Sequence, residues 1–256
     1  MQFLIPAAGL GSRFSALGYK DPKPMIKLHG IPLILWVITN FKYFEGDTIL
    51  IAIRDNTVNQ NKIKELTRNI KARIEFIVID KLTDGAARTV DIASQLLDPK
   101  EPLIVANSDQ FVASDLNPFR NLVESQNIDG AILTMKASSN KWSYVSKNNF
   151  GNITKVVEKT EISPEATVGI YGWSKLSSFQ ESFIEMISNE DKTNNEYYLA
   201  PTYNYLIKEG KIIKPCNAGE INKTIFGLGT PEDLEYFKNL PISIQYSEEI
   251  IKLISA

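Results

Sequence analysis

Continuous hydrophobic runs alternate with amphipathic segments along the first half of the chain. The runs are rich in Ile, Val and Phe, as strands are, and they occur at 2–6, 48–53, 74–79, 102–106 and 129–135. Between the early runs, apolar residues recur at the helical spacing i, i+3, i+4, i+7. This spacing occurs at Ile34, Val37, Ile38, Phe41 and Phe44, and at Ala86, Val90, Ala93 and Leu97. Strands that are apolar throughout and alternate with helices predict βαβ units on a mostly parallel sheet buried on both faces.

The pattern changes after about residue 137, where strand-like segments follow one another without long helices between them. These segments, at 143–146, 153–158 and 166–171, indicate an antiparallel addition to the sheet. Helical spacing returns at Phe179, Phe183 and Ile187, and over 198–207. A last helix is expected to begin near Pro231, because Thr230 suits its N-cap and acidic residues fill its first turn.

We therefore expect an α/β fold in a single domain that spans residues 1–256. Its sheet would be Rossmann-like, open, mixed and mostly parallel, with helices on both faces. A smaller antiparallel or irregular lobe would be added by the second half of the chain, from about residue 137 onward.

The composition of the chain narrows the chemistry that it can perform. One His and one Cys in 256 residues exclude a disulfide within the chain, a Cys-rich zinc site and a two-His metal site. His29 is expected in a turn before a helix, and Cys216 in the core. The net charge of −2 argues against a nucleic-acid-binding domain, which carries a strong basic excess. The chemistry must fall mainly to Lys, Arg, Asp, Glu and backbone amides, with or without a hard metal ion.

The sequence contains no segment with the ~20 uninterrupted apolar residues that a membrane span requires. The apolar start at 1–8 lacks the basic region of a signal peptide and continues directly into a glycine-rich loop. We therefore expect a cytoplasmic protein whose partners include neither a nucleic acid nor a membrane.

The glycine-rich loop follows the first predicted strand directly. Residues 6–14 read Pro-Ala-Ala-Gly-Leu-Gly-Ser-Arg-Phe. Small residues let the backbone approach a ligand closely, successive amides bind an anion, and Arg13 adds a fork suited to phosphate oxygens. A dinucleotide-binding loop would need a third glycine where Phe14 stands, and the Gly-Lys-Ser/Thr of a Walker A loop occurs nowhere in the chain. A glycine turn without a ligand is the remaining alternative.

A lysine between two prolines follows this loop, in the segment Asp21-Pro22-Lys23-Pro24-Met25. The prolines fix the backbone dihedral φ and hold the lysine on a stiff, extended segment. A lysine that serves solubility alone gains nothing from that rigidity, whereas one that meets a phosphate in the transition state does. The segment therefore favours a positioned lysine for phosphate chemistry.

The order of these motifs resembles that of the sugar-phosphate nucleotidyltransferases, also called nucleotide-sugar pyrophosphorylases. In that family a first strand ends in Ala-Gly-x-Gly-Ser/Thr-Arg, and Pro-Lys-Pro follows after a short gap. The resemblance continues, in the family's order, through Thr83-Asp84-Gly85-Ala86-Ala87, Asn107-Ser108-Asp109, Val157-Glu158-Lys159, 167–171, Asn195-Glu196-Tyr197-Tyr198-Leu199 and 229–234. It implies that the phosphate of a sugar 1-phosphate or a similar phosphorylated small molecule attacks the α-phosphorus of a nucleoside triphosphate. Pyrophosphate would leave, as in nucleotide-sugar synthesis for polysaccharides or capsules.

The resemblance also implies which residues carry the reaction. Catalysis would fall to Arg13, Lys23 and Asp109, with Asp109 as the ligand of a Mg²⁺ cofactor. Nucleotide-binding residues would lie within about 1–136 and comprise Ala7, Ala8, Gly9, Gly11, Ser12, Arg13, Lys23, Asp84, Gly85, Ala86 and Ser108. Acceptor-binding residues would lie within about 137–256 and comprise Tyr144, Glu158, Lys159, Gly169, Tyr171 and Glu196. Taken alone, Asp109 is also typical of a turn or helix cap, and Glu158-Lys159 of a solvated pair.

Two positions depart from the family pattern. Many members carry a second metal-binding Asp where this chain has Gly227, and the candidates to replace it are Glu196, Glu220 and Asn222. One carboxylate together with the phosphates of the nucleotide is the other solution. The family's base-contacting Gln is not evident at 80–84, so CTP is as credible as UTP or dTTP, and Asp84 or a backbone carbonyl could accept the amine of cytosine.

The glycine at position 227 also leaves a second hypothesis for the function. It is a non-catalytic regulatory module that binds a nucleotide or a nucleotide sugar. The oligomeric state is open, a homo-oligomer included.

Overall fold

The computed structural model describes residues 1–54, 58–125 and 127–255. Its strands are β1 (Gln2–Ala7), β2 (Lys27–Leu28), β3 (Ile31–Pro32), β4 (Asp47–Ile53), β5 (Ala72–Val78), β6 (Leu103–Ala106), β7 (Gln110–Val112), β8 (Gly130–Lys136), β9 (Ser143–Lys147), β10 (Ile153–Glu158), β11 (Glu165–Trp173), β12 (Ile213–Glu220) and β13 (Ile225–Gly227). Its helices are α1 (Ser12–Ser15), α2 (Leu33–Ile38), α3 (Gln60–Leu66), α4 (Ala86–Ser94), α5 (Asn117–Glu124), α6 (Leu176–Ser188), α7 (Tyr203–Lys208), α8 (Pro231–Lys238) and α9 (Pro241–Ser255). Short 3₁₀ helices occur at Lys23–Met25 (η1) and Ala200–Thr202 (η3).

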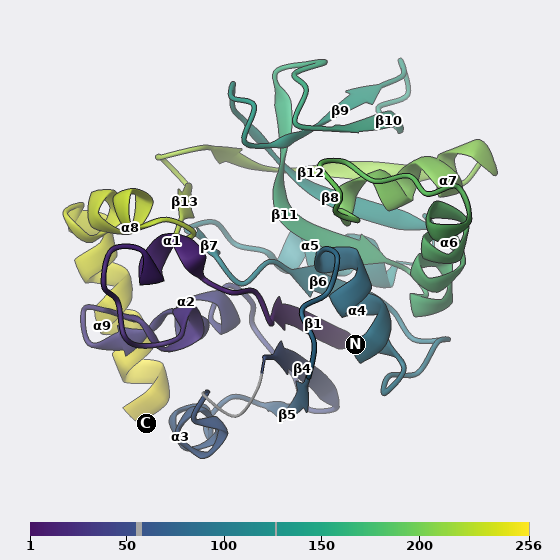
Figure 1. Ribbon diagram of the computed structural model, residues 1–256. Helices are drawn as coiled ribbons and strands as arrows, with labels where there is room; N and C mark the ends of the chain where they lie inside the picture. The colour runs from purple at the N-terminus through teal and green to yellow at the C-terminus, as the bar shows by residue number, and fades with distance from the viewer. Residues whose placement is uncertain (55–57, 126, 256) are drawn as a thin grey trace.

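A mixed sheet forms the centre of the molecule, and within the described ranges it has nine strands. Seven of them follow the order β10-β9-β11-β6-β1-β4-β5, while β8 pairs with β11 and β12 pairs with β8. Strands β1, β4, β5 and β6 are parallel to one another, and β9, β10 and β11 add the antiparallel part. The expected Rossmann-like α/β fold, with an open mixed sheet, a parallel centre and an antiparallel lobe, is confirmed. Figure 1 shows this lobe extending away from the parallel strands.

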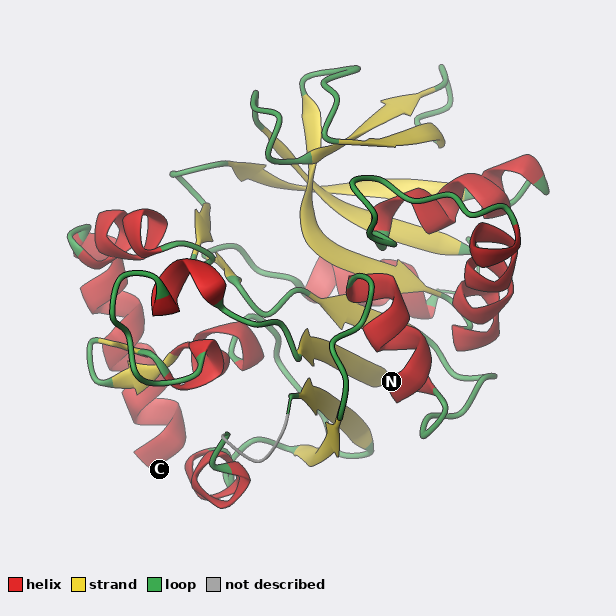
Figure 2. Ribbon diagram, in the orientation of Figure 1, coloured by secondary structure: helices red, strands yellow, loops and turns green. Residues whose placement is uncertain are grey.

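Helices lie on both faces of the sheet (Figure 2). Side chains packed between the sheet and these helices form two separate cores. Phe3 and Ile5 of β1 belong to one core, together with residues of α2, α5, α8 and α9. Leu4, whose side chain points to the opposite face, belongs to the other core with residues of α4, α6 and α7. Burial on both faces explains why these strands read as continuous hydrophobic runs rather than as alternating ones.

Two helix predictions need correction. The spacing that continues from Ile34 to Phe44 predicts one long helix, but α2 ends at Ile38. The chain turns there because the side chain of Asn40 bonds instead to the backbone of Gln110 and Val112, at 2.9 Å each. The expected last helix is in fact two helices, α8 and α9, because Pro241 begins the second one. Strands β7, β12 and β13 and helices α3 and α5 were not anticipated from the sequence.

The single histidine lies in the turn that joins β2 to β3, as expected, and has a positive φ of 49°. Its Nε2 atom lies 2.8 Å from Oγ of Ser243, so the turn also contacts α9. Cys216 is a half-buried residue of β12 that packs against the first core. None of the helices in the described ranges combines the length and the hydrophobicity needed to cross a membrane.

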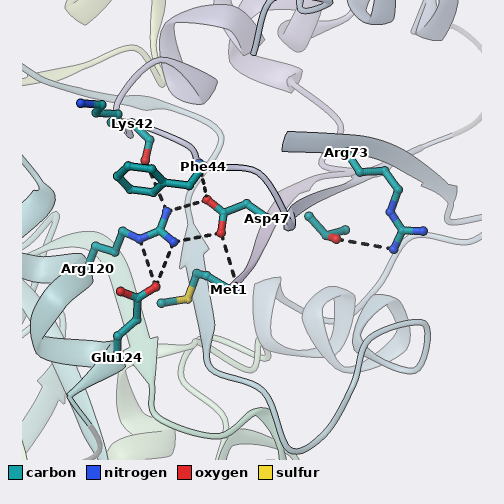
Figure 3. Close-up of polar contacts among 8 residues, drawn as sticks. Met1, Lys42, Phe44, Asp47, Arg73, Arg120 and Glu124 are labelled. Carbon is teal, nitrogen blue, oxygen red and sulfur yellow. Dashed lines mark hydrogen bonds and ion pairs between the residues drawn. The ribbon is translucent and has the colours of Figure 1, made fainter. Parts of the chain in front are cut away.

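A buried ion-pair network ties the starts of β1 and β4 to α5 (Figure 3). The guanidinium of Arg120 donates to both carboxylate oxygens of Asp47, at 2.5 and 2.9 Å, and to Glu124 at 2.9 Å. The amino group of Met1 lies 3.5 Å from Asp47, and the guanidinium stacks 4.5 Å from the centre of the Phe44 ring. Because this network lies where the parallel strands begin, it stabilises the sheet at the end opposite to the glycine-rich loop.

Candidate active site

The parallel strands end side by side at one edge of the sheet, and two loops with polar residues leave this edge from neighbouring strands. Residues 8–11 follow β1, and residues 107–109 follow β6. In the parallel part of the sheet, β1 lies between β4 on one side and β6 on the other. The chain passes from β1 to β4 and β5 in one direction and then returns to β6, so the strand order reverses between β1 and β6. Open α/β sheets bind ligands in the crevice at such a reversal, outside the carboxyl ends of the strands. The fold thus places the glycine-rich loop beside Asp109.

Two hollows occupy this edge and share part of their lining. The large hollow has a volume of about 1110 Å³ and the small hollow one of about 370 Å³. Gly9, Arg13 and Asp109 line both. The small hollow is bounded by the glycine-rich loop and Lys23, whereas the large one extends to Lys159 at the base of the antiparallel lobe. The two hollows therefore form one cleft, with the glycine-rich loop at one end and the lobe at the other.

The glycine-rich loop packs closely against Lys23. Gly11 has a φ of +62°, which favours glycine, and a Cβ atom on it would lie 3.2 Å from Cβ of Lys23. Pro22 is extended, as the two prolines predict, but Lys23 itself begins the 3₁₀ helix η1. This turn directs the lysine from the extended segment toward the small hollow.

The ammonium group of Lys23 lies 2.8 Å from Oδ2 of Asp109, and both side chains are partly exposed to the cleft. Two residues from the β13 segment support the aspartate. The amide of Leu228 donates to the carbonyl oxygen of Asp109 at 2.7 Å. A Cβ atom on Gly229 would lie only 2.8 Å from Oδ2, so the glycine makes room for the carboxylate. A cation and an anion are thus held together on the wall of the small hollow.

The far end of the cleft is built around Lys159, whose φ of 57° is unusual for a residue with a side chain. Its Nζ atom donates to the hydroxyl of Tyr198, and this bond raises the pKa of Lys159. Burial raises the pKa of the neighbouring Glu158, against the lowering effects of a hydrogen bond from Ser143 and the charge of Lys159. The two residues thus present a cation and a carboxyl group to the same end of the cleft.

The segment around Tyr197 lies against the loop before α4. The amide of Tyr197 donates to the carbonyl of Asp84 at 2.7 Å, and its carbonyl accepts from the amide of Ala87 at 3.1 Å. A Cβ atom on Gly85 would lie 2.3 Å from that same carbonyl, so only glycine allows this approach. The carboxylate of Asp84 pairs with Lys192 at 2.8 Å, and this bond lowers the pKa of Asp84.

The structure gathers most of the residues expected at a site. Along the cleft lie Ala7, Gly9, Gly11, Ser12, Arg13, Lys23, Ala86, Ser108, Asp109, Glu158, Lys159, Gly169, Tyr171 and Glu196. Four others are placed elsewhere. Ala8 is buried in the core, Gly85 faces Tyr197, and Asp84 lines a separate hollow of about 380 Å³ with Arg88. Tyr144 is fully buried, and its hydroxyl is used by the backbone of Ser139.

The cleft also contains side chains that the sequence did not single out as contacts. Asn107, Gln110, Trp142, Tyr198 and Asp233 line the large hollow. Of the three candidates to replace the second metal-binding Asp, which are Glu196, Glu220 and Asn222, only Glu196 lines the large hollow. Glu220 pairs instead with Lys223 at 2.9 Å. Asn107 and Gln110 could have been suspected as polar residues directly after a buried strand. Trp142 had no such signal. Asp233 lies in the segment 229–234 of the resemblance, but it was interpreted there only as an acid in the first turn of a helix.

Comparison with known proteins agrees with this geometry. The sequence matches the nucleotidyl transferase family over residues 3–206. The chain belongs to that family. Among curated relatives, it is 25% identical over 235 residues to the bifunctional protein GlmU of Aliarcobacter butzleri (strain RM4018), covering 86% of this chain and 49% of that protein. It is 26% identical over 177 residues to mannose-1-phosphate guanylyltransferase 1 of Arabidopsis thaliana, covering 67% of this chain and 49% of the relative.

The chain thus spans about half the length of the curated relatives it matches. Its fold is that of a nucleoside-diphosphate-sugar pyrophosphorylase from Vibrio cholerae RC9, with a TM-score of 0.82, 24% identity, and 93% and 100% of the two chains covered. It is also that of an inositol-1-phosphate CTP transferase from T. maritima, with a TM-score of 0.70, 14% identity, and 99% and 95% covered.

Proposed function

We propose that this protein transfers a nucleoside monophosphate from a nucleoside triphosphate to a sugar 1-phosphate or a similar phosphorylated small molecule. Pyrophosphate is the second product. The observation that carries the proposal is one cleft that contains the glycine-rich loop, the Lys23–Asp109 pair and Lys159. Family membership supports the same class of reaction.

The glycine-rich loop binds the triphosphate in this proposal. The backbone at Gly9 and Gly11 can approach the phosphates closely, and Arg13 offers a planar fork to their oxygens. Lys23 stabilises the charge that develops at the α-phosphate. Lys23 and Asp109 neutralise each other at 2.8 Å. When a triphosphate binds Lys23, Asp109 loses this partner, and a divalent cation would then neutralise its charge.

Lys159 binds the phosphate of the acceptor, and Glu158 accepts hydrogen bonds from the hydroxyl groups of the acceptor. An oxygen of the acceptor phosphate forms a bond to the α-phosphorus while the bond to the β-phosphate oxygen breaks. Because the nucleophile is already an anion, no histidine or cysteine is needed as a base or a nucleophile. This agrees with the position of His29 in a turn bound to α9, away from the cleft.

A divalent cation such as Mg²⁺ fits the donors at this site, since Asp109 offers carboxylate oxygen and no soft ligand lines the small hollow. In the part of the chain that the structure describes, no three His, Cys, Asp or Glu side chains come together. Phosphate oxygens and waters would therefore complete the ligand set. When bound, Mg²⁺ would neutralise phosphate charge beside Lys23.

We propose a pyrimidine nucleotide, CTP, UTP or dTTP. The carboxylate of Asp84 is paired with Lys192 and Arg88 and lines a separate hollow, so we favour a backbone carbonyl over this carboxylate as the acceptor for the amine of cytosine. A backbone carbonyl of residues 80–84 is then the contact for CTP, whereas a backbone amide would serve UTP or dTTP. The name of one structural neighbour includes CTP transferase, and that of a second includes thymidylyltransferase.

The test is a pyrophosphate-release screen of five nucleoside triphosphates against sugar 1-phosphates, inositol phosphate and other phosphomonoesters. We expect release with one acceptor class, and with a pyrimidine triphosphate in preference to ATP and GTP. Nucleotide binding without release for any acceptor would overturn the proposal in favour of a non-catalytic regulatory module. No binding of any triphosphate would contradict both functions.

A further inference from the structure

Two carboxylates stand beside neighbouring glycines at the end of β13, on the wall of the large hollow. Oδ2 of Asp109 lies 2.8 Å from where a Cβ atom of Gly229 would be. Oδ2 of Asp233 lies 3.4 Å from where a Cβ atom of Gly227 would be. Both acids and both glycines line the large hollow. Because Gly227 and Gly229 have no side chains, they leave the two carboxylates accessible from the cleft.

Asp233 has a fixed backbone but a carboxylate without a partner. Its amide donates to Oγ1 of Thr230, the N-cap of α8, at 3.1 Å. Its carboxylate accepts no hydrogen bond and forms no ion pair with any residue in the described ranges. The nearby Lys238, in contrast, is already paired with Glu235 at 3.1 Å. An anion that is held in place yet unpaired is available to a cationic ligand.

An independent observation on the wall of the same hollow concerns Gln110, which is directly opposite Gly227 in the antiparallel pair of β7 and β13. Its Oε1 atom lies 2.7 Å from where a Cβ atom of Gly169 would be, and Gly169 lines the large hollow too. Opposite residues of such a pair project to the same face. Gln110 is only 8% exposed, it lines the large hollow, and its buried Oε1 atom has no hydrogen-bond partner among the described residues. A buried oxygen without a partner is costly unless a ligand supplies one.

We propose that Asp233 is the second protein carboxylate for the divalent cation of the proposed reaction, acting together with Asp109. This assignment rests on the proposed function. Divalent magnesium takes oxygen ligands, usually one or two carboxylates with phosphates and waters, and the pair at Gly227 and Gly229 supplies that number. Residue 227 is a glycine and cannot supply this carboxylate. Asp233, in the first turn of α8, supplies it instead beside the same wall of the cleft.

The alternative acids are less suitable. Glu220 is bound to Lys223 and does not line the cleft. Glu196 lies at the end of the cleft near Lys159, whose pKa it helps to raise. Glu232 also lines the large hollow, but the atoms nearest to a Cβ on Gly227 all belong to Asp233, as those nearest to a Cβ on Gly229 all belong to Asp109.

The test measures Mn²⁺ binding by the full chain directly, from the loss of the free-ion electron paramagnetic resonance signal, with no substrate present. Asp233→Asn and Asp109→Asn should each weaken Mn²⁺ binding on the order of tenfold or more, because affinity follows the number of charged ligands. Glu235→Gln is the matched control, since it removes the same charge from α8 outside the cleft, and it should leave affinity within about twofold.

A second variant distinguishes a ligand from a merely structural residue. Gly227→Asp in the Asp233→Asn background should restore Mn²⁺ affinity to within about threefold of wild type, because a carboxylate returns to the same wall of the cleft. Melting temperatures of all variants show whether each is folded.

Wild-type affinity in Asp233→Asn, with weakened binding in Asp109→Asn, would overturn the role of Asp233 and leave the proposed function intact. Equal binding by all variants, or no saturable Mn²⁺ binding by the wild type, would overturn the carboxylate pair. Nucleotidyl transfer would then be judged by the pyrophosphate-release screen alone.

Discussion

The substitution Gly229→Ala tests whether the placement of the Asp109 carboxylate matters to the reaction. The new Cβ atom would lie 2.8 Å from Oδ2, whereas ordinary contacts begin at 3.4 Å. The carboxylate must therefore move by about 0.6 Å, away from its present place 2.8 Å from Lys23, and a misplacement of ~1 Å can cost ~100-fold in rate. We expect kcat/KM for pyrophosphate release to fall about tenfold.

The free energy of unfolding should change little in this variant. Gly229 does not have a positive φ, so alanine is compatible with its backbone. Because alanine lowers the conformational entropy of the unfolded chain, it should raise the free energy of unfolding by only about 0.4–1 kcal/mol. Gly227→Ala is the matched control, because its Cβ atom makes only ordinary contacts with Asp233 at 3.4–3.5 Å. Full activity in a folded Gly229→Ala protein, or an equal loss in both variants, would refute the reasoning.

Two further predictions concern the framework of the site. Gly85→Ala should lower both the melting temperature and the activity, because its Cβ atom would lie 2.3 Å from the carbonyl of Tyr197 at a φ of +128°; an unchanged thermal melt would contradict this. Asp47→Asn should reduce the free energy of unfolding, measured in urea at pH 7, by about 3 kcal/mol, because it breaks a buried pair with Arg120. Burial alone would raise the pKa of Asp47, but the hydrogen bond and charge of Arg120 lower this pKa overall. The wild type should therefore lose the stability that the Asp47–Arg120 pair contributes as the pH falls below about 4, whereas the variant should not.

The fold could be predicted well where a local pattern determines it. The parallel strands of the first half are apolar on both faces, so their sequences directly show double burial. Helix α2 shows the limit of that reasoning, because the spacing continues to Phe44 while the helix ends at Ile38. Its end depends on Asn40 bonding to β7, a contact 70 residues away that no local pattern contains.

The same distinction applies to the candidate site. Gly9, Gly11, Arg13 and Lys23 could be found because a loop and a rigid segment close in sequence form a recognisable compound motif. Asp233 belongs to the quoted segment 229–234, but its place in the cleft could not be predicted, because it arises from the packing of α8 against the end of β13.

Asp84 shows the opposite limit of sequence reasoning. Its place in the motif suggested a contact to the base, but the folded chain pairs its carboxylate with Lys192 and Arg88.

The most direct test of nucleotidyl transfer follows the label of an α-³²P-labelled pyrimidine triphosphate in single-turnover reactions with an acceptor phosphate. We expect the wild type to move the label into a nucleotide-linked product with no labelled protein, and Lys23→Ala to do so about 10²–10³-fold more slowly. Label bound covalently to the protein, or transfer by Lys23→Ala at the rate of the wild type, would contradict the account.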